Sequence, residues 1–199
     1  MLTHYGCSLI LLLWTGLAAA DKPSSDPAWV TSSQSTLPHV AFQATQRGAL
    51  DPLILNSAAQ WGLDPFLLKG LLLVESGLLP TITNPRSGAV GIAQFVPSGR
   101  WAVTRIRRLR DPRAAVFTTA MALDPHQAIP AAAELMAYLI AQYGRDRGLN
   151  AYNTGKPLQH TTTFLLSVIR QANRLRTAAG LWPLPAPQPR RRRPPPSTC

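Results

Sequence analysis

The sequence predicts a mainly α-helical fold, and three observations support this prediction. First, Asp-Pro occurs four times in the central part of the chain, at positions 51–52, 64–65, 111–112 and 124–125. Aspartate caps the free N–H groups of a first helical turn, and proline suits the first helical position. Second, Gly62 and Gly77 follow the first two pairs at the distance of a helix C-cap. Third, no convincing run of alternating strand residues occurs.

These signals place the helices in order along the chain. We expect helices at about 52–61, 65–76, 112–122 and 130–143, a short helix near 146–153 and a last helix at 162–178. Because Pro130 falls inside the fourth pattern, that helix either begins or kinks at this residue. Prolines and glycines surround segment 81–91, so we expect an irregular loop there, with a small β-hairpin as the alternative.

The domain organisation follows from changes in composition. Residues 8–17 are apolar and three alanines follow them, which is typical of a signal peptide cleaved after residue 20. An apolar run of about ten residues is too short for a transmembrane helix, so we expect an exported, periplasmic protein without a membrane anchor after cleavage. We expect residues 21–49 to form a linker or N-terminal arm, 50–181 the compact domain, and 182–199 a disordered tail rich in proline and arginine.

The cysteines and the charge limit the possible partners. After cleavage only Cys199 remains, so no internal disulfide is expected and the core must supply the stability. The net charge of +11 is concentrated in six arginines within 100–113 and four at 190–193. Nucleic acid, an anionic envelope surface or an acidic protein would suit such charge. Export separates the chain from most nucleic acid and no recognised binding motif occurs, so no nucleic-acid partner is expected. The first arginine cluster is interpreted as a solvated face.

Glu75 is the first candidate for chemistry. It is one of only two glutamates, it lies in a run of leucines, and the next acidic residue downstream is Asp111. Desolvation in such surroundings disfavours the charged form and raises the pKa of the carboxyl, as a general acid requires. The alternative is that Glu75 lies on the wet edge of an amphipathic helix and has no chemical role.

Glu75 belongs to the first of three patches that line up along the chain. They are Val-Glu-Ser-Gly-Leu at 74–78, Asn-Pro-Arg-Ser-Gly-Ala-Val-Gly-Ile-Ala-Gln-Phe-Val-Pro at 84–97, and Ala-Tyr-Asn-Thr-Gly at 151–155. Taken singly, each has an ordinary structural explanation: Gly88 and Gly91 as turn residues, Gln94 as a surface amide, and Tyr152 as a core aromatic. Their order and spacing together indicate a functional site.

Together the patches resemble the catalytic domain of the soluble lytic transglycosylases (SLT), lysozyme-like enzymes that cut bacterial peptidoglycan. That family shows Glu-Ser at a helix end, then Ser-x-x-Gly-Ala-x-Gly-Leu-Met-Gln, then Ala-Tyr-Asn-x-Gly; this chain has Glu75-Ser76 followed by 88–94 and 151–155. The resemblance covers about 50–175 and implies a lysozyme-like α domain with an irregular loop or small hairpin after the catalytic helix. Two departures are that Ala93 stands where methionine is usual and Pro85 where serine is usual.

The resemblance implies cleavage of the β-1,4 bond between MurNAc and GlcNAc by a glycan-cleaving lyase. A single Glu75 acts first as acid and then as base, the substrate's acetamido group assists, and the sugar's 6-hydroxyl attacks in place of water to give a 1,6-anhydro-muramyl end. The sequence offers no obvious second carboxylate of the kind that most glycosidases use. Asp111 and Asp124 follow the logic of helix starts, and Glu134 lies in an alanine-rich helix.

The resemblance also assigns roles to the other site residues. Ser76 is expected to hydrogen-bond Glu75 and orient it, and Gln94 to bind an N-acetyl or hydroxyl group of the glycan. Tyr152 is expected to contact the catalytic carboxyl and Asn153 to shape the same wall. Gly88 and Gly91 are expected to allow close approach of the backbone to the ligand. No metal or cofactor is expected, because the four histidines (His4, His39, His126 and His160) show no ligand spacing.

Two further hypotheses concern the setting of the enzyme. The small size, expected signal peptide and basic tail are similar to the transglycosylases of conjugation and type IV secretion systems, whose machinery proteins would then be partners besides peptidoglycan strands. The alternatives to a lytic transglycosylase are a lysozyme-type hydrolase on the same scaffold, or a weakly active assembly or binding protein of a secretion system. Mass analysis of the cleavage products separates these alternatives.

Overall fold

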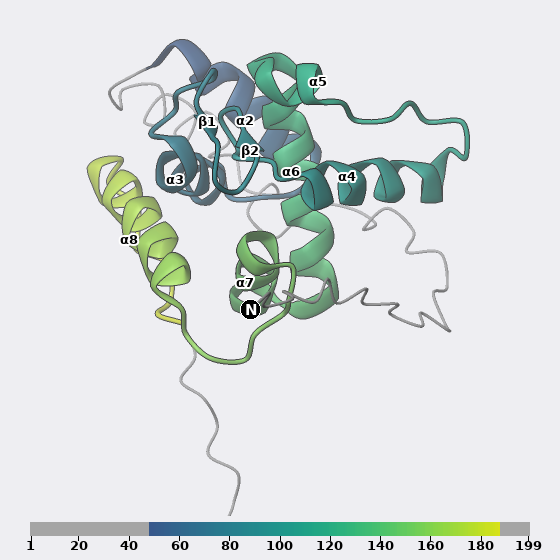
Figure 1. Cartoon of the computed structure of the whole chain (residues 1–199). Coiled ribbons are helices and arrows are strands. Elements are labelled where there is room, and N and C mark those ends of the chain that lie inside the picture. Colours follow the sequence, from purple (N-terminus) through teal and green to yellow (C-terminus); the bar gives the residue numbers. More distant parts are fainter. Residues whose placement is uncertain (1–47, 188–199) are drawn as a thin grey trace, which may run out of the picture.

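The computed structural model of the chain describes residues 48–187 and confirms a mainly α-helical fold (Figure 1). The expected signal peptide, most of the expected arm and the arginine-rich end of the tail lie outside these residues. No helix within 48–187 is long and apolar enough to cross a membrane. The elements are η1 (Gly48–Leu50), α2 (Asp51–Gln60), α3 (Pro65–Ser76), β1 (Thr83–Asn84), β2 (Ala89–Val90), α4 (Pro97–Arg110), α5 (Thr119–Leu123), α6 (Pro125–Tyr143), α7 (Arg145–Thr154) and α8 (Thr163–Ala178).

The start and end of α3 form as the sequence predicts. The Asp64 carboxyl accepts hydrogen bonds from the backbone N–H groups of Phe66 at 2.8 Å and Leu67 at 3.0 Å, which caps the helix N-terminus. Gly77 ends the helix in the left-handed conformation, at φ 63°. The same carboxyl of Asp64 also pairs with Arg176 on α8, so one side chain both starts α3 and ties it to the last helix.

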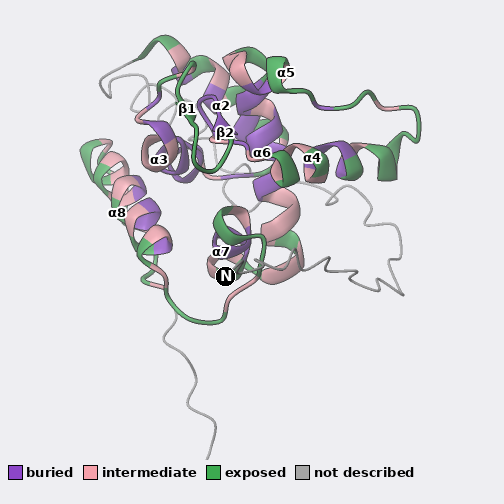
Figure 2. Cartoon of the chain, in the orientation of Figure 1, coloured by how far each residue is buried: buried purple, intermediate pink, exposed green. Residues whose placement is uncertain are grey.

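The core surrounds α3 and α6 (Figure 2). Helix α6 contacts α2, α4, α5 and α7, and α8 packs along α3. Gly70 permits the second contact, because a Cβ there would lie 2.9 Å from the backbone nitrogen of Ala172 on α8. A buried ion pair, with Lys69 Nζ donating to Asp51 Oδ1 at 2.6 Å, joins α3 to the start of α2. These contacts hold the C-terminal end of α3, where Glu75 lies, on a rigid support.

The expected helix at 112–122 is wrong, and α4 was not expected at all. Helix α4 ends at Asp111, its C-cap, and Pro112 follows. Proline after a helix end is common because it cannot continue the helix, so this Asp-Pro pair marks an end rather than a start. Residues 111–118 form no helix or strand, and only the short α5 follows them. The arginines of α4 hide its periodicity in the sequence, since only Val103, Thr104 and Ile106 are buried.

Helix α6 begins at Pro125 and not at Pro130. The Asp124 carboxyl accepts a hydrogen bond from the N–H of His126 at 2.9 Å and caps the helix. Pro130 lies inside the helix, where its missing N–H leaves one backbone bond unmade. The Asp124-Pro125 pair therefore sets the start of the helix, and Pro130 does not prevent the helix from continuing through it.

The hairpin alternative for segment 81–91 is confirmed. Strands β1 and β2 pair antiparallel, with Thr83 opposite Val90 and Asn84 opposite Ala89. Gly88 occupies the turn at φ 70°, in the left-handed region that favours glycine. A further bridge pairs Val90 with Phe95, so the chain folds back once more directly after the hairpin. This second fold carries the second patch towards α3.

The first residues of the expected tail are attached to the domain. Residues 182–187 form no helix or strand, but the backbone N–H of Leu184 donates to the side chain of Asn173 at 2.6 Å, and Arg176 Nε donates to the carbonyl of Trp182 at 2.7 Å. Both Asn173 and Arg176 lie on α8. The domain contacts therefore extend beyond residue 181 to at least residue 184.

Candidate active site

Glu75 lies in the last turn of α3, partly buried, immediately before the Ser76–Gly77 end of the helix. Among the described residues its carboxyl makes no hydrogen bond and no ion pair. Desolvation by the surrounding side chains raises its pKa from 4.5 to about 8. The carboxyl therefore holds its proton at neutral pH, as the sequence predicted. A neutral carboxylic acid in a partly accessible position is able to act as a general acid.

Tyr152, on α7, lies beside Glu75. Burial raises the pKa of the Tyr152 hydroxyl well above its ordinary value, and the negative charge of an ionised Glu75 raises it further. The hydroxyl donates a hydrogen bond to the carbonyl of Ala93 at 3.2 Å. Glu75 and Tyr152, which are 77 positions apart in the chain, are thus close enough to interact electrostatically. The Tyr152 hydroxyl stays neutral beside the Glu75 carboxyl.

The second patch is clamped between α3 and α7 through two successive carbonyls. Ser76 Oγ lies 2.7 Å from the carbonyl oxygen of Ile92 and 3.2 Å from that of Leu72, while Tyr152 bonds the carbonyl of Ala93. The expectation that Ser76 hydrogen-bonds Glu75 is wrong, because its hydroxyl proton is given to backbone carbonyls. Ser76 instead attaches α3 to the loop that follows the hairpin.

Gln94 adopts a left-handed backbone, at φ 47°, which is uncommon for a residue other than glycine. Its side-chain amide nitrogen donates to the carbonyls of Gly91 at 2.9 Å and Ile82 at 3.3 Å. These two bonds hold the strained turn closed and orient the side chain. The amide oxygen makes no hydrogen bond within the described residues, so it is the atom of Gln94 left to accept a bond from a ligand. Glycan binding by Gln94 stays a prediction.

The two glycines of the second patch each have a structural reason within the fold, and their expected close approach to a ligand stays a prediction. A Cβ at Gly91 would lie 1.8 Å from the carbonyl oxygen of Ala122, and the backbone there has φ 77°. Gly91 therefore allows the hairpin to touch α5, so the close approach is to protein backbone. A Cβ at Gly88 would meet only Pro97, at 3.7 Å, so Gly88 is required by its turn conformation.

Two other predicted positions differ in exposure. Asn153 is exposed at the C-terminal end of α7 and is free to contact a ligand, so its wall-forming role stays a prediction. Ala93 is fully buried, so its methyl group does not contact a bound sugar directly. Its carbonyl, which accepts the Tyr152 hydroxyl, is the group that matters at this position.

The sequence analysis missed two supporting residues. Phe95 is buried between two aromatic rings, with its centroid 5.1 Å from Phe117 and 6.5 Å from Tyr152. Asn150 is buried on α7, donates to the carbonyls of Leu158 and His160 at 3.0 Å each, and accepts the hydroxyl of Thr162 at 2.6 Å. Asn150 thereby fixes the loop between α7 and α8, and Phe95 supports the ring of Tyr152.

Within residues 48–187, the three carboxylates weighed as partners of Glu75 are engaged elsewhere. Asp124 caps α6, and Asp111 accepts the backbone N–H of Arg113 at 2.9 Å. Glu134 is buried and pairs with Arg107 and Arg110. The interpretation of the arginine cluster as a solvated face is therefore wrong for Arg107, which is partly buried, whereas Arg110 is paired but exposed. Within residues 48–187, no group of three His, Cys, Asp or Glu side chains is placed to hold a metal ion.

Comparisons with known proteins identify the family of the domain. The family model "Transglycosylase SLT domain" matches residues 52–162. The endo-type membrane-bound lytic murein transglycosylases A of two Klebsiella pneumoniae strains are each 40% identical to this chain over 47 residues, which are 24% of this chain and 23% of the relative. An inactive mutant of the lytic transglycosylase Slt from Pseudomonas aeruginosa has a similar fold, with a TM-score of 0.55 and 17% identity over 71% of this chain and 27% of that one.

The match is partial in length but complete across the candidate site. The chain spans about a quarter of the length of the relatives and of the solved structure that it matches. The family match covers more than half of this chain and contains Glu75, the hairpin with Gln94, and Tyr152. The chain therefore belongs to the transglycosylase SLT domain family.

Proposed function

We propose that this protein is a peptidoglycan lytic transglycosylase that cleaves the β-1,4 bond between MurNAc and GlcNAc. The observation that carries the proposal is Glu75. In a domain of the SLT family, it is a desolvated carboxylic acid with a pKa of about 8, beside Tyr152 and without a second free carboxylate among the described residues. That combination supports a reaction in which one side chain transfers both protons.

The reaction follows from this single acid. Neutral Glu75 protonates the glycosidic oxygen as the bond to C1 of MurNAc breaks through an oxocarbenium-like transition state. The carboxylate that remains is a strong base for its kind, because its conjugate acid has a pKa of about 8. It then takes the proton of the same sugar's 6-hydroxyl as that oxygen bonds to C1. The products are a 1,6-anhydro-muramyl end and a GlcNAc with a free 4-hydroxyl, and Glu75 is protonated again.

The other site residues support these two steps. Tyr152 holds the loop of Ala93 next to the acid and fills space that water would otherwise occupy, which maintains the desolvation of Glu75. In this proposal the amide oxygen of Gln94 accepts the N–H of an N-acetyl group, and the exposed Asn153 makes a further contact with the glycan. Ser76 and Gly88 act on the site through the loop and the turn that they stabilise.

The cellular setting is part of the proposal. We place the protein outside the cytoplasm, in the periplasm, after cleavage of residues 1–20, where it opens the wall locally for a conjugation or type IV secretion apparatus. The apolar run at 8–17 supports export. Detection of the mature protein in the periplasmic fraction, and loss of secretion or DNA transfer when Glu75 is changed to Gln, would support this setting. Retention in the cytoplasm would contradict it.

Mass analysis of products tests the chemistry. Purified peptidoglycan digested by the protein should yield muropeptides with anhydro ends, each one water lighter than a reducing-end product. The Glu75→Gln variant, purified in parallel, should yield neither product, which excludes a contaminating enzyme. Reducing ends alone would show a lysozyme-type hydrolase on this scaffold. Absence of cleavage together with retained binding to secretion proteins would favour the assembly-protein alternative.

A further inference from the structure

Helix α4 and the segment after it form an arm that projects from the body of the domain (Figure 1). We call residues 97–116 the α4 arm. It packs against α6 through one side of α4, where Val103 and Ile106 are buried. Residues 111–116 are exposed except for Ala114, which is partly buried. The other side of the arm therefore faces the surroundings of the protein.

Large apolar side chains gather on the exposed side of this arm. Trp101 is 61% exposed, Leu109 55% and Val116 54%. They are three of the seven large apolar side chains that are exposed among the described residues. Exposed apolar side chains that gather in one place mark an interaction surface, whereas scattered single ones need no explanation. The α4 arm is therefore a candidate for contact with a partner.

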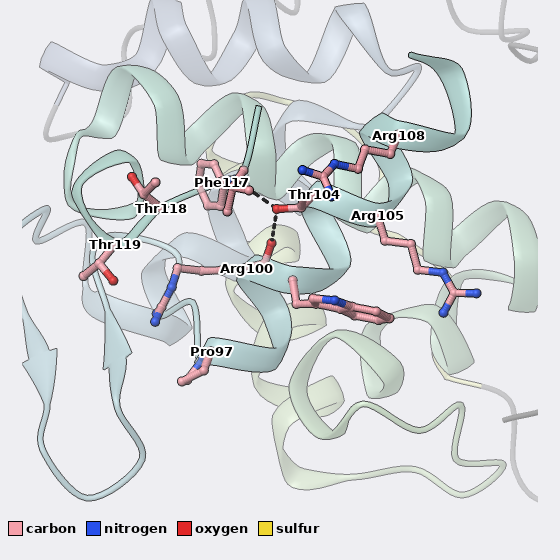
Figure 3. A pocket seen from close by; sticks show the side chains of 10 residues that line it. Pro97, Arg100, Thr104, Arg105, Arg108, Phe117, Thr118 and Thr119 are labelled. Atoms are coloured by element: carbon pink, nitrogen blue, oxygen red, sulfur yellow. Dashed lines mark hydrogen bonds between the residues drawn. The ribbon is translucent and has the colours of Figure 1, made fainter. Parts of the chain in front are cut away.

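The fold brings these side chains together with basic ones. Positions 101, 105, 108 and 109 lie on one face of α4, at the spacing of a helical stripe. Trp101, Arg108 and Val116 line one groove of about 610 Å³ beside α4 (Figure 3). Thr104 fixes this groove, because its hydroxyl accepts the backbone N–H of Phe117 at 2.9 Å. Apolar and basic side chains are thus interleaved on a surface that the fold holds in place.

The arm is strongly basic. It contains six arginines and one acidic residue, Asp111. Arg107 and Arg110 pair with the buried Glu134 on α6, so these two arginines attach the arm to the domain. The charge that a partner can meet must come from arginines on the exposed side.

Arg108 and Arg113 supply positive charge on the exposed side. Arg108 Nε donates a hydrogen bond to the carbonyl of Ala114 at 3.2 Å, which orients the guanidinium on a neutral group. The backbone N–H of Arg113 donates to the Asp111 carboxyl at 2.9 Å, so this bond engages the backbone of Arg113 and not its guanidinium. Both side chains reach the solvent, where an anionic surface can meet them.

An anionic phospholipid bilayer is the partner whose chemistry matches both kinds of side chain. Headgroup phosphates attract arginines that lie near the surface, and tryptophan and aliphatic side chains enter the boundary between headgroups and acyl chains. The phosphates of a nucleic acid would give Leu109 and Val116 no apolar contact. A stable protein partner needs a matched interface of about 1,200–2,000 Å², whereas a deformable bilayer adapts to a projecting arm.

We propose that the α4 arm binds the surface of an anionic phospholipid bilayer. Trp101, Leu109 and Val116 enter the headgroup layer, and Arg108 and Arg113 contact lipid phosphates. Helix α4 begins where the second patch ends, so a bound arm keeps the candidate active site close to the membrane. Lipid binding requires no catalysis, so it is independent of the proposed function and can be tested without it.

Vesicle binding by the full purified chain tests the charge of the arm. Vesicles of phosphatidylcholine are compared with vesicles that also contain phosphatidylglycerol, and flotation measures the bound protein. R108Q/R113Q removes two charges from the arm, and R170Q/R174Q removes two charges from exposed positions on α8. We expect the wild type to bind the anionic vesicles more tightly. R108Q/R113Q should raise the lipid concentration for half-maximal binding about fivefold to thirtyfold, and R170Q/R174Q should change it by less than about twofold.

A second set of variants tests the apolar contact. W101S/L109S keeps every charge of the arm and should raise the half-maximal lipid concentration about fivefold. L166S on α8, at a position that is 44% exposed, is the matched control and should equal the wild type. Vesicles with brominated acyl chains should quench the tryptophan fluorescence of the wild type more than that of W101F, because quenching requires contact with the acyl chains.

The outcomes separate a docking face from general charge. Weaker binding by both arm variants, with unchanged α8 controls and quenching that depends on Trp101, supports the inference even if the protein cleaves no glycan. Equal binding by all variants overturns it, as does absence of vesicle binding. Equal losses for the arm and α8 variants would overturn it in favour of net charge alone. Capture of the wild type by immobilised polyglutamate but not by vesicles would overturn it in favour of an acidic protein partner.

Two controls make these comparisons valid. Circular dichroism of each variant should match that of the wild type, because every changed side chain lies at an exposed position. Residues outside 48–187 are the same in every variant, so a difference between variants reports on the arm or on α8.

Discussion

The two glutamates of this chain occupy opposite kinds of environment. Glu75 is partly exposed and makes no ion pair or hydrogen bond among the described residues, and its pKa is raised to about 8 by desolvation. Glu134 is only 4% exposed, yet it is paired with Arg107, whose Nε donates to it at 2.8 Å, and with Arg110. The more deeply buried carboxyl is thus the one whose charge is compensated. Burial raises the pKa of a carboxyl by desolvation, and a cationic partner opposes that shift, as Lys69 does at Asp51.

The difference separates a chemical role from a structural one. Glu134 joins α4 to α6, and each of its carboxylate oxygens is paired with an arginine. Glu75 lies in the last turn of α3, a helix that α8, Lys69 and Asp64 hold in place. These contacts offset the free-energy cost of burying an unpaired carboxyl. In the proposed reaction, the proton held by this uncompensated acid is the one given to the glycosidic oxygen. Four predictions test this contrast.

The largest effect is expected at Glu75 itself. Changing Glu75→Gln removes the proposed proton donor while preserving the shape of the side chain. Turnover of purified peptidoglycan should fall by about a thousandfold or more, since one group supplies both proton transfers. Circular dichroism and thermal unfolding should show an intact fold. Cleavage within tenfold of the wild type by this variant would show that Glu75 is not the acid.

The counterpart change is Glu134→Gln, which should affect stability and not chemistry. The amide cannot neutralise Arg107 and Arg110, so the free energy of unfolding should fall by about 2–3 kcal/mol. Denaturant unfolding at neutral pH measures this loss, and turnover per folded molecule should be unchanged. A double-mutant cycle with Arg107→Gln should show coupling between the two sites. A variant that is stable but inactive would assign Glu134 to the reaction and break the contrast.

The pH dependence of stability gives a smaller but distinctive effect. The pKa of Glu75 is higher in the folded state, about 8, than its ordinary value of 4.5. The folded state therefore binds this proton more tightly, and the stability lost on ionisation grows as pH rises from about 4.5 to 8. Glu75→Gln has no such loss, so its stability relative to wild type should increase by roughly 1–2 kcal/mol from pH 5 to pH 9, discounted for partial exposure. Parallel stability profiles would show that Glu75 is solvated.

The smallest effect is expected for Tyr152→Phe. The change deletes the hydrogen bond to the Ala93 carbonyl and keeps the ring, so the free energy of unfolding should fall by about 1 kcal/mol. The loop becomes less well placed, and kcat should fall about tenfold with little change in KM. Asn153→Ala, one residue further along α7 and exposed, is the matched control and should leave stability unchanged. A loss as large as that of Glu75→Gln would make Tyr152 a proton carrier.

The sequence by itself determined those features that depend on neighbours along the chain. Asp64 and Gly77 define the start and end of α3, because helix caps act within a few residues. The leucines around Glu75 predict a desolvated carboxyl for the same reason. The three patches also identified the family, since their spacing is a property of the chain. The prolines and glycines of segment 81–91 also predict a hairpin as one alternative, because turn residues act locally.

Only the tertiary structure decided features that depend on contacts between distant segments. The Ser76 hydroxyl donates its hydrogen bond to the carbonyl of Ile92 and not to its neighbour Glu75. Position 91 must be glycine because any Cβ there would collide with the carbonyl of Ala122 on α5. The arginines of α4 look alike in the sequence, yet packing against α6 pairs Arg107 and Arg110 with the buried Glu134. Which partner a polar group finds is settled by the folded geometry, because hydrogen bonds and ion pairs act over a few ångströms in space and regardless of separation in the chain.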